Sequence, residues 1–168
     1  MKKLILLFLF IAIAVISYPQ EKSVVVDKVT GKNMLVGKVN IQDFQDTAFA
    51  GWWNEEYNNY EPDSVAADSL KNRLKGIQIS VIMGTWCGDS RREVPRFFRI
   101  LEALEYPAET VDIICVDREK QGLQNETEGL EIEAVPTFIF YQYEKEVGRI
   151  IESPEETLEK DMLDILGS

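Results

Sequence analysis

The chain contains no histidine, and its 168 residues include only two cysteines, Cys87 and Cys115. The absence of histidine excludes metal sites of the His or Cys/His kind and catalytic triads built on histidine. Two cysteines can form at most one disulfide, which excludes a small scaffold held together by several bridges. We therefore expect no metal and no cofactor, and we look for chemistry that a single thiol can perform.

Basic residues are also scarce, with 18 lysines and arginines against 29 acidic residues and a net charge of −11. A chain with this balance is repelled by phosphate backbones, so nucleic acid is not an expected partner. The simplest interpretation of the excess acid is solubility, and an acidic recognition surface is the less favoured alternative.

Long hydrophobic runs are missing except at the N-terminus. Two lysines there precede an apolar run from Leu4 to Ile16, which is too short to span a bilayer comfortably but is typical of a signal peptide. We expect residues 1–17 to be a signal peptide cleaved after Ser17, and the mature protein to be exported to the periplasm or cell envelope. An uncleaved N-terminal anchor, which would attach the protein to the membrane, is the alternative.

The remaining length suggests one domain. Residues 18–33 are polar and predict a lead-in with at most a short strand, and residues 34–168 predict an α/β domain. Apolar runs predict strands at 34–39, 77–83 and 111–116. Residues 137–143 and 146–151 alternate around Glu144-Lys145 and predict an antiparallel hairpin.

Helical patterns lie between these strands. Asn40 and Asp43 resemble a capping box that opens a helix reaching about residue 57, and Asp63 caps a second helix that ends at Gly76. Further helices are expected at 88–106, weakly at 119–128, and after a capping box at 153–156. This alternation predicts a layer of strands covered by helices.

Cys87 lies where a buried strand passes into a helix, in the segment Thr85-Trp86-Cys87-Gly88-Asp89-Ser90. Backbone N–H groups at a helix N-terminus, together with the helix dipole, favour the thiolate, which is the nucleophilic form of cysteine. Ser90 stands three positions further on, where a second thiol would be needed to close a disulfide. This site can therefore attack a disulfide but cannot close one. A buried, inert Cys87 is the alternative.

Three landmarks together resemble the thioredoxin family over about residues 34–168: Trp86-Cys87-Gly88 after a strand, Pro95 within the following helix, and Val135-Pro136-Thr137 before a hairpin and a closing helix. The resemblance implies a thioredoxin-like fold, a central mixed β-sheet flanked by helices. It also implies that Cys87 is the attacking thiol and Trp86 an apolar shield beside it. Val135 and Pro136, joined by a cis bond, would form the substrate-binding loop that faces the sulfur.

The chain departs from the family pattern at several positions. Ser90 replaces the resolving cysteine, and Val81 stands where many thioredoxins have a buried aspartate. The helical insertion at 40–76, rich in tryptophan and tyrosine, resembles the extended N-terminal part of some exported bacterial thioredoxin-like proteins. Its aromatic residues are interpreted as packing rather than as a binding platform. Cys115, in an apolar strand, is expected to be a buried free thiol, with a resolving role as the minor alternative.

The favoured hypothesis is a monothiol thiol–disulfide oxidoreductase of the cell envelope. Cys87 would attack protein or small-molecule disulfides, a regenerating thiol would release the product, and Ser90 would donate a hydrogen bond to the thiolate. This chemistry suits disulfide isomerisation or deglutathionylation. A non-catalytic peptide-binding or chaperone-like module is the second hypothesis. A monothiol glutaredoxin that holds an iron–sulfur cluster is a distant third.

Overall fold

The computed structural model describes residues 22–167 and contains a six-stranded sheet in the order β1-β2-β4-β3-β5-β6. Strands β3 and β4 are parallel, and every other neighbouring pair is antiparallel, so the sheet is mixed as expected. The strands are β1 Lys22–Val26, β2 Asn33–Val39, β3 Ile77–Met83, β4 Asp112–Cys115, β5 Thr137–Gln142 and β6 Lys145–Ile151. The signal-peptide prediction for residues 1–17 lies outside the described residues.

The α-helices bury their apolar sides in one large core, which also contains the side chains of one face of the sheet. Each of the four α-helices contributes a side chain to this core, namely Trp53, Leu70, Phe97 and Met162. The α/β class and the thioredoxin-like arrangement of sheet and helices are therefore confirmed. The helices are η1 Ile41–Gln45, α1 Ala50–Asn59, α2 Ser64–Leu70, α3 Gly88–Ala103, η2 Ala108–Thr110 and α4 Leu158–Leu166.

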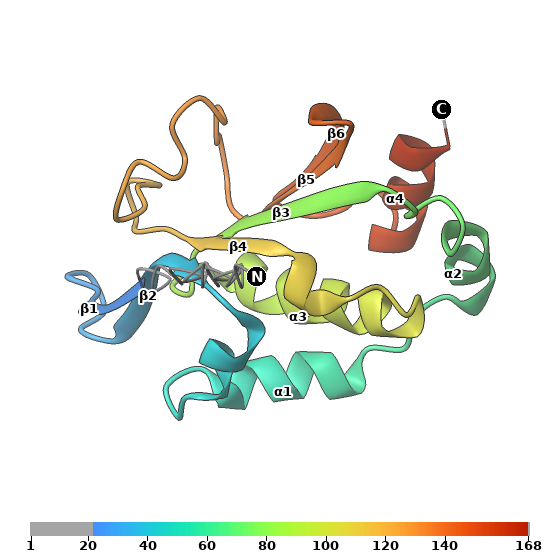
Figure 1. The fold of residues 1–168 in the computed structure, drawn as a ribbon. Helices are drawn as coiled ribbons and strands as arrows, with labels where there is room; N and C mark the ends of the chain where they lie inside the picture. The colour runs from blue at the N-terminus through green and yellow to red at the C-terminus, as the bar shows by residue number, and fades with distance from the viewer. Residues whose placement is uncertain (1–21, 168) are drawn as a thin grey trace, which may run out of the picture.

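The other face of the sheet carries a smaller apolar cluster and is covered by a loop. The cluster comprises Ile82, Ile114, Val116, Val135 and Ile139. Leu130 and Ile132, from the loop between β4 and β5, pack against it. In Figure 1 this loop lies on the side of the sheet away from α1 and α3.

The helix expected at 119–128 is wrong, because this part of the loop is made of turns. Lys120 and Asn125 have φ values of 60° and 59°, in the left-handed region, which interrupts a right-handed helix at two points. Gly122 lies between them and adds no helix propensity. The apolar residues further along the loop reach the sheet without forming a helix.

The helix expected from residue 40 to about residue 57 is divided into two, although its cap is confirmed. The Asn40 side chain accepts a hydrogen bond from the Gln42 N–H, and the Asp43 carboxylate accepts from the Asn40 N–H at 2.9 Å. The helix that follows is a 3-10 turn that ends at Gln45. Asp46 is extended (φ −60°, ψ 144°) and its carboxylate accepts from the Ala48 N–H, which separates η1 from α1.

The capping box expected at 153–156 is wrong as well, since α4 begins at Leu158. Thr157 is the N-cap, and its hydroxyl accepts from the Lys160 N–H. The N–H groups of Glu155 and Glu156 bind the Asp161 carboxylate instead. Thr157 is extended and precedes an acidic first turn, so it is a more favourable N-cap than Ser153, which is followed by Pro154.

The insertion at 40–76 is part of the core. Trp53 is 2 % exposed and stacks on Phe44, with ring centroids 4.3 Å apart. After α1, the Tyr60 hydroxyl donates to the fully buried carboxylate of Glu159 in α4, which also accepts from the Asp63 N–H at 3.0 Å. These contacts join the insertion to α4, and they agree with the interpretation of its aromatic residues as packing.

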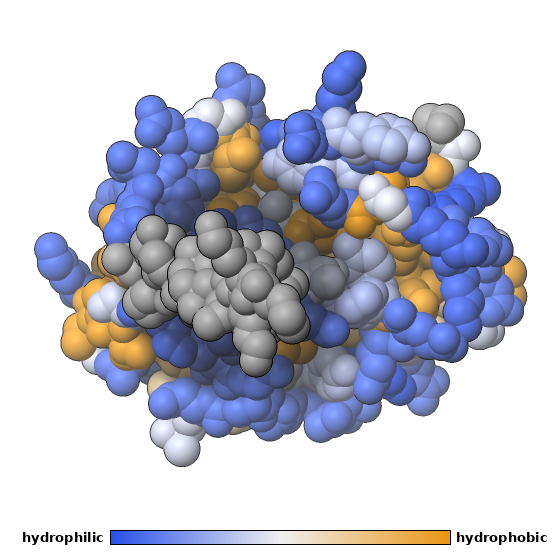
Figure 2. Space-filling model, viewed as in Figure 1, coloured by the Kyte–Doolittle hydropathy of each residue, from blue (hydrophilic) through white to orange (hydrophobic). Residues whose placement is uncertain are grey.

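Polar side chains cover most of the face shown in Figure 2. An apolar area at its left edge overlies the hairpin of β1 and β2 seen in Figure 1, where Val24, Val26 and Val29 are 55, 61 and 72 % exposed. No helix within residues 22–167 is long and apolar enough to cross a membrane.

Candidate functional site

Cys87 occupies the N-cap position of α3, directly after the turn that follows β3. Its N–H donates to the Gly84 carbonyl at 2.9 Å, and its own carbonyl accepts from the Arg91 N–H, the first hydrogen bond of the helix. The side chain is partly exposed, and its thiol donates to the Val135 carbonyl at 3.2 Å. The sulfur therefore lies at a helix N-terminus, within reach of solvent and against a second loop.

The loop at Val135 and Pro136 faces Cys87, and the peptide bond between these two residues is cis. The Pro136 carbonyl accepts from the Glu152 N–H at 2.7 Å, and the Thr137 hydroxyl donates to the Ala134 carbonyl at 2.8 Å. These bonds hold the loop in place beside the sulfur. The structure thus brings together Cys87, Val135 and Pro136, which lie almost fifty residues apart in the sequence.

Ser90 lies on the first turn of α3 and is fully buried. Its hydroxyl oxygen accepts from the Gly84 N–H at 3.2 Å, which connects the helix to the end of the turn that carries Cys87. Because the oxygen is the acceptor in this bond, its hydrogen remains free for donation. A hydrogen bond from Ser90 to the Cys87 thiolate stays a prediction.

Trp86 is held on three sides. Its indole N–H donates to the Val116 carbonyl at 2.9 Å, and the Arg118 guanidinium lies 4.8 Å from the ring centroid. On the third side is Gly84, where an added Cβ would approach the indole to 2.6 Å. The close approach explains why glycine occupies position 84, and it fixes the indole beside the backbone of Cys87.

The charged residues on the first turn of α3 are engaged with the protein. Asp89 pairs with Arg92 at 2.8 Å, and Arg92 also binds Glu93 at 2.6 Å. Arg91 donates from Nε to the Thr85 carbonyl. Two carboxylates therefore compensate the charge of Arg92, whereas Arg91 is held by a neutral carbonyl and lies 5.7 Å from the centre of the Trp52 ring.

Cys115 lies on the face of the sheet opposite to Cys87. It is fully buried in the core that the helices cover, whereas Cys87 packs against the smaller cluster under the loop. Burial, and to a lesser extent the charge of Asp43, raises the pKa of the Cys115 thiol far above its usual range. The sheet itself separates the two sulfurs. The expected inert character of Cys115 agrees with this placement.

No pattern in the sequence indicated a role at the site for two residues that lie near it, Arg118 and Asp27. Asp27, in the turn between β1 and β2, is 2 % exposed and binds the Arg118 guanidinium through two hydrogen bonds of 2.8 Å. An aspartate in a polar lead-in carries no signal of burial. The only hint in the sequence is that Arg118 follows a strand adjacent to the one that leads to Cys87.

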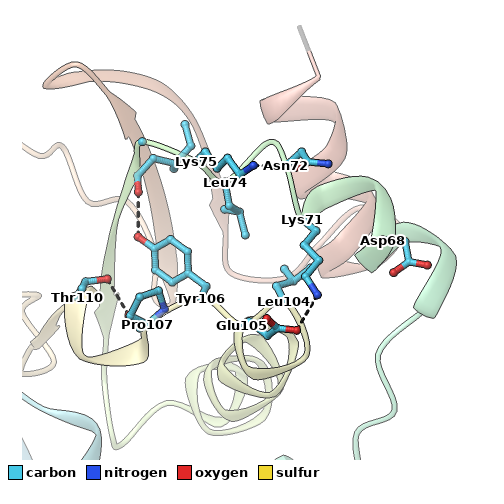
Figure 3. Close-up of a pocket in the computed structure, with 12 residues that line it drawn as sticks. Asp68, Lys71, Asn72, Leu74, Lys75, Leu104, Glu105, Tyr106, Pro107 and Thr110 are labelled. Atoms are coloured by element: carbon cyan, nitrogen blue, oxygen red, sulfur yellow. Dashed lines mark hydrogen bonds and ion pairs between the residues drawn. The ribbon is translucent and has the colours of Figure 1, made fainter.

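One cavity along residues 22–167 is remote from Cys87. It has a volume of about 680 Å³ and lies between the end of α2 and the turn after α3 (Figure 3). Lys71 and Glu105 pair across its mouth at 2.7 Å, and the Tyr106 hydroxyl donates to the Ile77 carbonyl. Ile77 begins β3 and Cys87 follows its far end, so a full strand separates the cavity from the thiol. Residues 22–167 also contain no acidic or cysteine cluster suited to a metal ion.

Comparisons with known proteins agree with this geometry. A family model described as thioredoxin matches residues 42–164. A thioredoxin-like protein of Acanthamoeba polyphaga mimivirus is 32 % identical over 96 residues, which cover 57 % of this chain and 67 % of the viral protein.

Among solved structures, the chain resembles the thioredoxin pre-protein of Schistosoma mansoni (24 % identity, 62 % of this chain and 90 % of the other, TM-score 0.39). It also resembles mitochondrial thioredoxin 3 of Saccharomyces cerevisiae (21 %, 65 % and 98 %, TM-score 0.40) and a Pseudomonas aeruginosa protein of unknown function (16 %, 70 % and 79 %, TM-score 0.43). The assignment follows from the family model, which includes the cysteine site and strands β3 to β6, and from the viral relative. The chain belongs to the thioredoxin family.

Proposed function

We propose that this protein is a monothiol thiol–disulfide oxidoreductase of the cell envelope, with Cys87 as its attacking thiol. Membership of the thioredoxin family supports a redox function of thiols in general. The more specific proposal, that Cys87 acts without a second thiol, rests on where the residues around its sulfur lie. Cys87 is partly exposed at a helix N-terminus, Ser90 occupies the position of a second thiol, and Cys115 is buried on the opposite face.

The chemistry is thiol–disulfide exchange, in which the regenerating thiol is the reductant whenever the substrate is left in its reduced form. The Cys87 thiolate attacks one sulfur of a disulfide, a bond forms between Cys87 and that sulfur, and the other sulfur leaves as a thiolate that takes up a proton. A second thiol, deprotonated, then attacks the substrate sulfur of the mixed disulfide, forms a new disulfide with it and releases Cys87 as the thiolate. The N-terminus of α3 stabilises the negative charge on Cys87 before the attack and after the release.

The loop that faces the sulfur suits an extended substrate. The Val135 carbonyl already accepts a hydrogen bond from the Cys87 thiol, so it points at the place where the disulfide would lie. Loss of the thiol proton would free this carbonyl for the backbone of an incoming peptide. Trp86, fixed against Val116, would cover the other side of the mixed disulfide and limit access by water.

We expect wild-type protein to release glutathione from a glutathionylated peptide when a small thiol is supplied, and Cys87→Ser to lose this turnover completely. A peptide-binding module would behave differently, because it would show no thiol-dependent turnover and would still retain its partners after Cys87→Ser. The measurement is the initial rate of glutathione release with and without added thiol. Equal rates in wild type and Cys87→Ser would refute the proposal.

The cellular location is proposed from the apolar run at Leu4 to Ile16. We expect the mature protein to begin near Tyr18, outside the cytoplasm, with the two N-terminal lysines removed. N-terminal sequencing and the intact mass of protein recovered from the cell envelope measure this. A full-length chain found in the cytoplasm would contradict the proposal, and a full-length chain in the membrane fraction would indicate the uncleaved anchor.

A further inference from the structure

The hairpin formed by β1 and β2 reaches the candidate site although it lies before residues 42–164, which the family model matches. Its contact with the site passes through one buried carboxylate. Asp27 accepts four hydrogen bonds: two from Arg118, one from the Thr30 hydroxyl at 2.6 Å and one from the Val29 N–H at 3.0 Å. These bonds hold the pKa of Asp27 well below its usual range, with those from Arg118 as the largest cause.

The backbone of the turn is fixed as firmly as the carboxylate. The Asp27 N–H donates to the Lys32 carbonyl at 2.8 Å, and the Asp27 carbonyl accepts from the Gly31 N–H at 2.8 Å. A carboxylate held in this way presents both oxygens to Arg118 in one orientation. The planar guanidinium matches them through two parallel bonds, a geometry that lysine cannot reproduce.

Arg118 connects this turn to Trp86 and to the sulfur. Its guanidinium lies 4.8 Å from the centre of the Trp86 ring, in the residue directly before Cys87. The pKa of Arg118 is raised, mainly by its hydrogen bonds to Asp27 and to a small extent by the negative charge of Cys87. The Arg118 guanidinium therefore contacts the residue that adjoins Cys87, and this contact places its charge at the thiol site. The first-turn arginines are engaged with Asp89, Glu93 and the Thr85 carbonyl.

We infer that the β1–β2 hairpin is a working part of the thiol site, in which Asp27 holds Arg118 over Trp86 so that the guanidinium stabilises the anionic sulfur of Cys87. Asp27 and Arg118 are positioning residues here, since they act through Trp86 and through the electric field rather than by contact with the reacting atoms. The inference builds on the proposed role of Cys87.

The test measures how fast iodoacetamide, a neutral reagent, alkylates Cys87 as a function of pH, with the labelled cysteine identified by peptide mass. Arg118→Met should slow the reaction about three- to ten-fold near neutral pH, because a nearby cation favours the thiolate, and should leave the rate at high pH unchanged. Arg118→Lys, which keeps the charge, should recover part of the loss. If the lysine and methionine variants are equally slow, or neither is slow, the inference fails.

Asp27→Asn distinguishes a role of Asp27 in positioning Arg118 from an effect of the Asp27 charge alone. Removal of a carboxylate near the site would, by charge alone, make the surroundings of Cys87 more positive and speed alkylation. If Asp27 positions Arg118, the opposite follows, and Asp27→Asn should be slower than wild type. A faster Asp27→Asn protein would overturn the positioning role.

Lys28→Met is the matched control, since it removes a cation from the same turn where the side chain is exposed. Its alkylation rate should equal that of wild type, and a loss as large as that of Arg118→Met would mean that any cation of the hairpin suffices, against the inference. Thermal unfolding identifies the temperature at which each variant is fully folded, and the rates are compared there. Because alkylation needs no disulfide substrate, these results stand apart from turnover, which tests the proposed function.

Discussion

Ser90→Cys should convert the protein into a dithiol reductase. In the proposed mechanism the mixed disulfide on Cys87 of the wild type is released only by an external thiol, because Ser90 cannot attack it. A cysteine at position 90 lies one helical turn away, and an intramolecular thiol acts at an effective concentration on the order of millimolar or more. We expect reduction of a protein disulfide, with a dithiol regenerating the enzyme, to rise at least about tenfold over wild type.

The geometry around Ser90 makes this substitution conservative. The hydroxyl is fully buried and accepts from the Gly84 N–H, and a thiol of similar size replaces it as a weaker acceptor. Ser69→Cys is the matched control, because Ser69 is exposed on α2 and its thiol would be remote from Cys87. Reductase activity that rises equally in both variants would show that any added thiol suffices. Strong activity already present in wild type would refute the monothiol interpretation.

Trp53→Ala should cost about 3 to 5 kcal/mol of unfolding free energy, the range for truncating a large buried aromatic side chain. Trp53 is 2 % exposed, stacks on Phe44 and lies 5.6 Å from the ring of Phe98 in α3. Its loss would leave a cavity between α1 and α3 that these rings cannot fill without moving. Urea unfolding measures the effect, and a similar slope in both proteins would show that the midpoint alone has moved.

Trp52→Phe is the control from the neighbouring position. The Trp52 indole N–H is buried with no hydrogen-bond partner within residues 22–167, so its removal leaves no acceptor unpaired. The substitution keeps an aromatic ring against Phe44 and should cost less than about 1.5 kcal/mol. If Trp53→Ala proved as mild as this control, the insertion at 40–76 would not belong to the core. Loss of partner capture at unchanged stability would instead favour a binding platform.

The sequence predicted the elements whose signals are local. Apolar runs indicate β2, β3 and β4, and alternation around one turn indicates the hairpin of β5 and β6. The cap at Asn40 needs only the two polar side chains that flank its first turn. The predictions at 119–128 and at 153–156 failed where several local signals compete. The backbone at Lys120 and Asn125 is left-handed, and Thr157 is a better cap than Ser153.

The candidate site was predictable only in part, for a physical reason. Trp86, Cys87 and Ser90 lie within one short segment, so their spacing at a strand-to-helix junction is visible in the sequence. The pairing of Asp27 with Arg118 joins residues 91 positions apart, and only the fold brings them together. The same holds for the two cysteines. Their placement on opposite faces depends on which residues of β4 point toward the helices, and that alternation is set by register rather than by composition.

The central claim, that Cys87 has no resolving partner in its own chain, is tested most directly by the intact mass of wild-type protein after reaction with glutathione disulfide. If Cys87 has no resolving thiol, the protein should carry one glutathione adduct, mapped to Cys87. This adduct should persist after excess reagent is removed and disappear when a small thiol is added. Loss of the adduct without added thiol, with formation of a disulfide between Cys87 and Cys115, would contradict it.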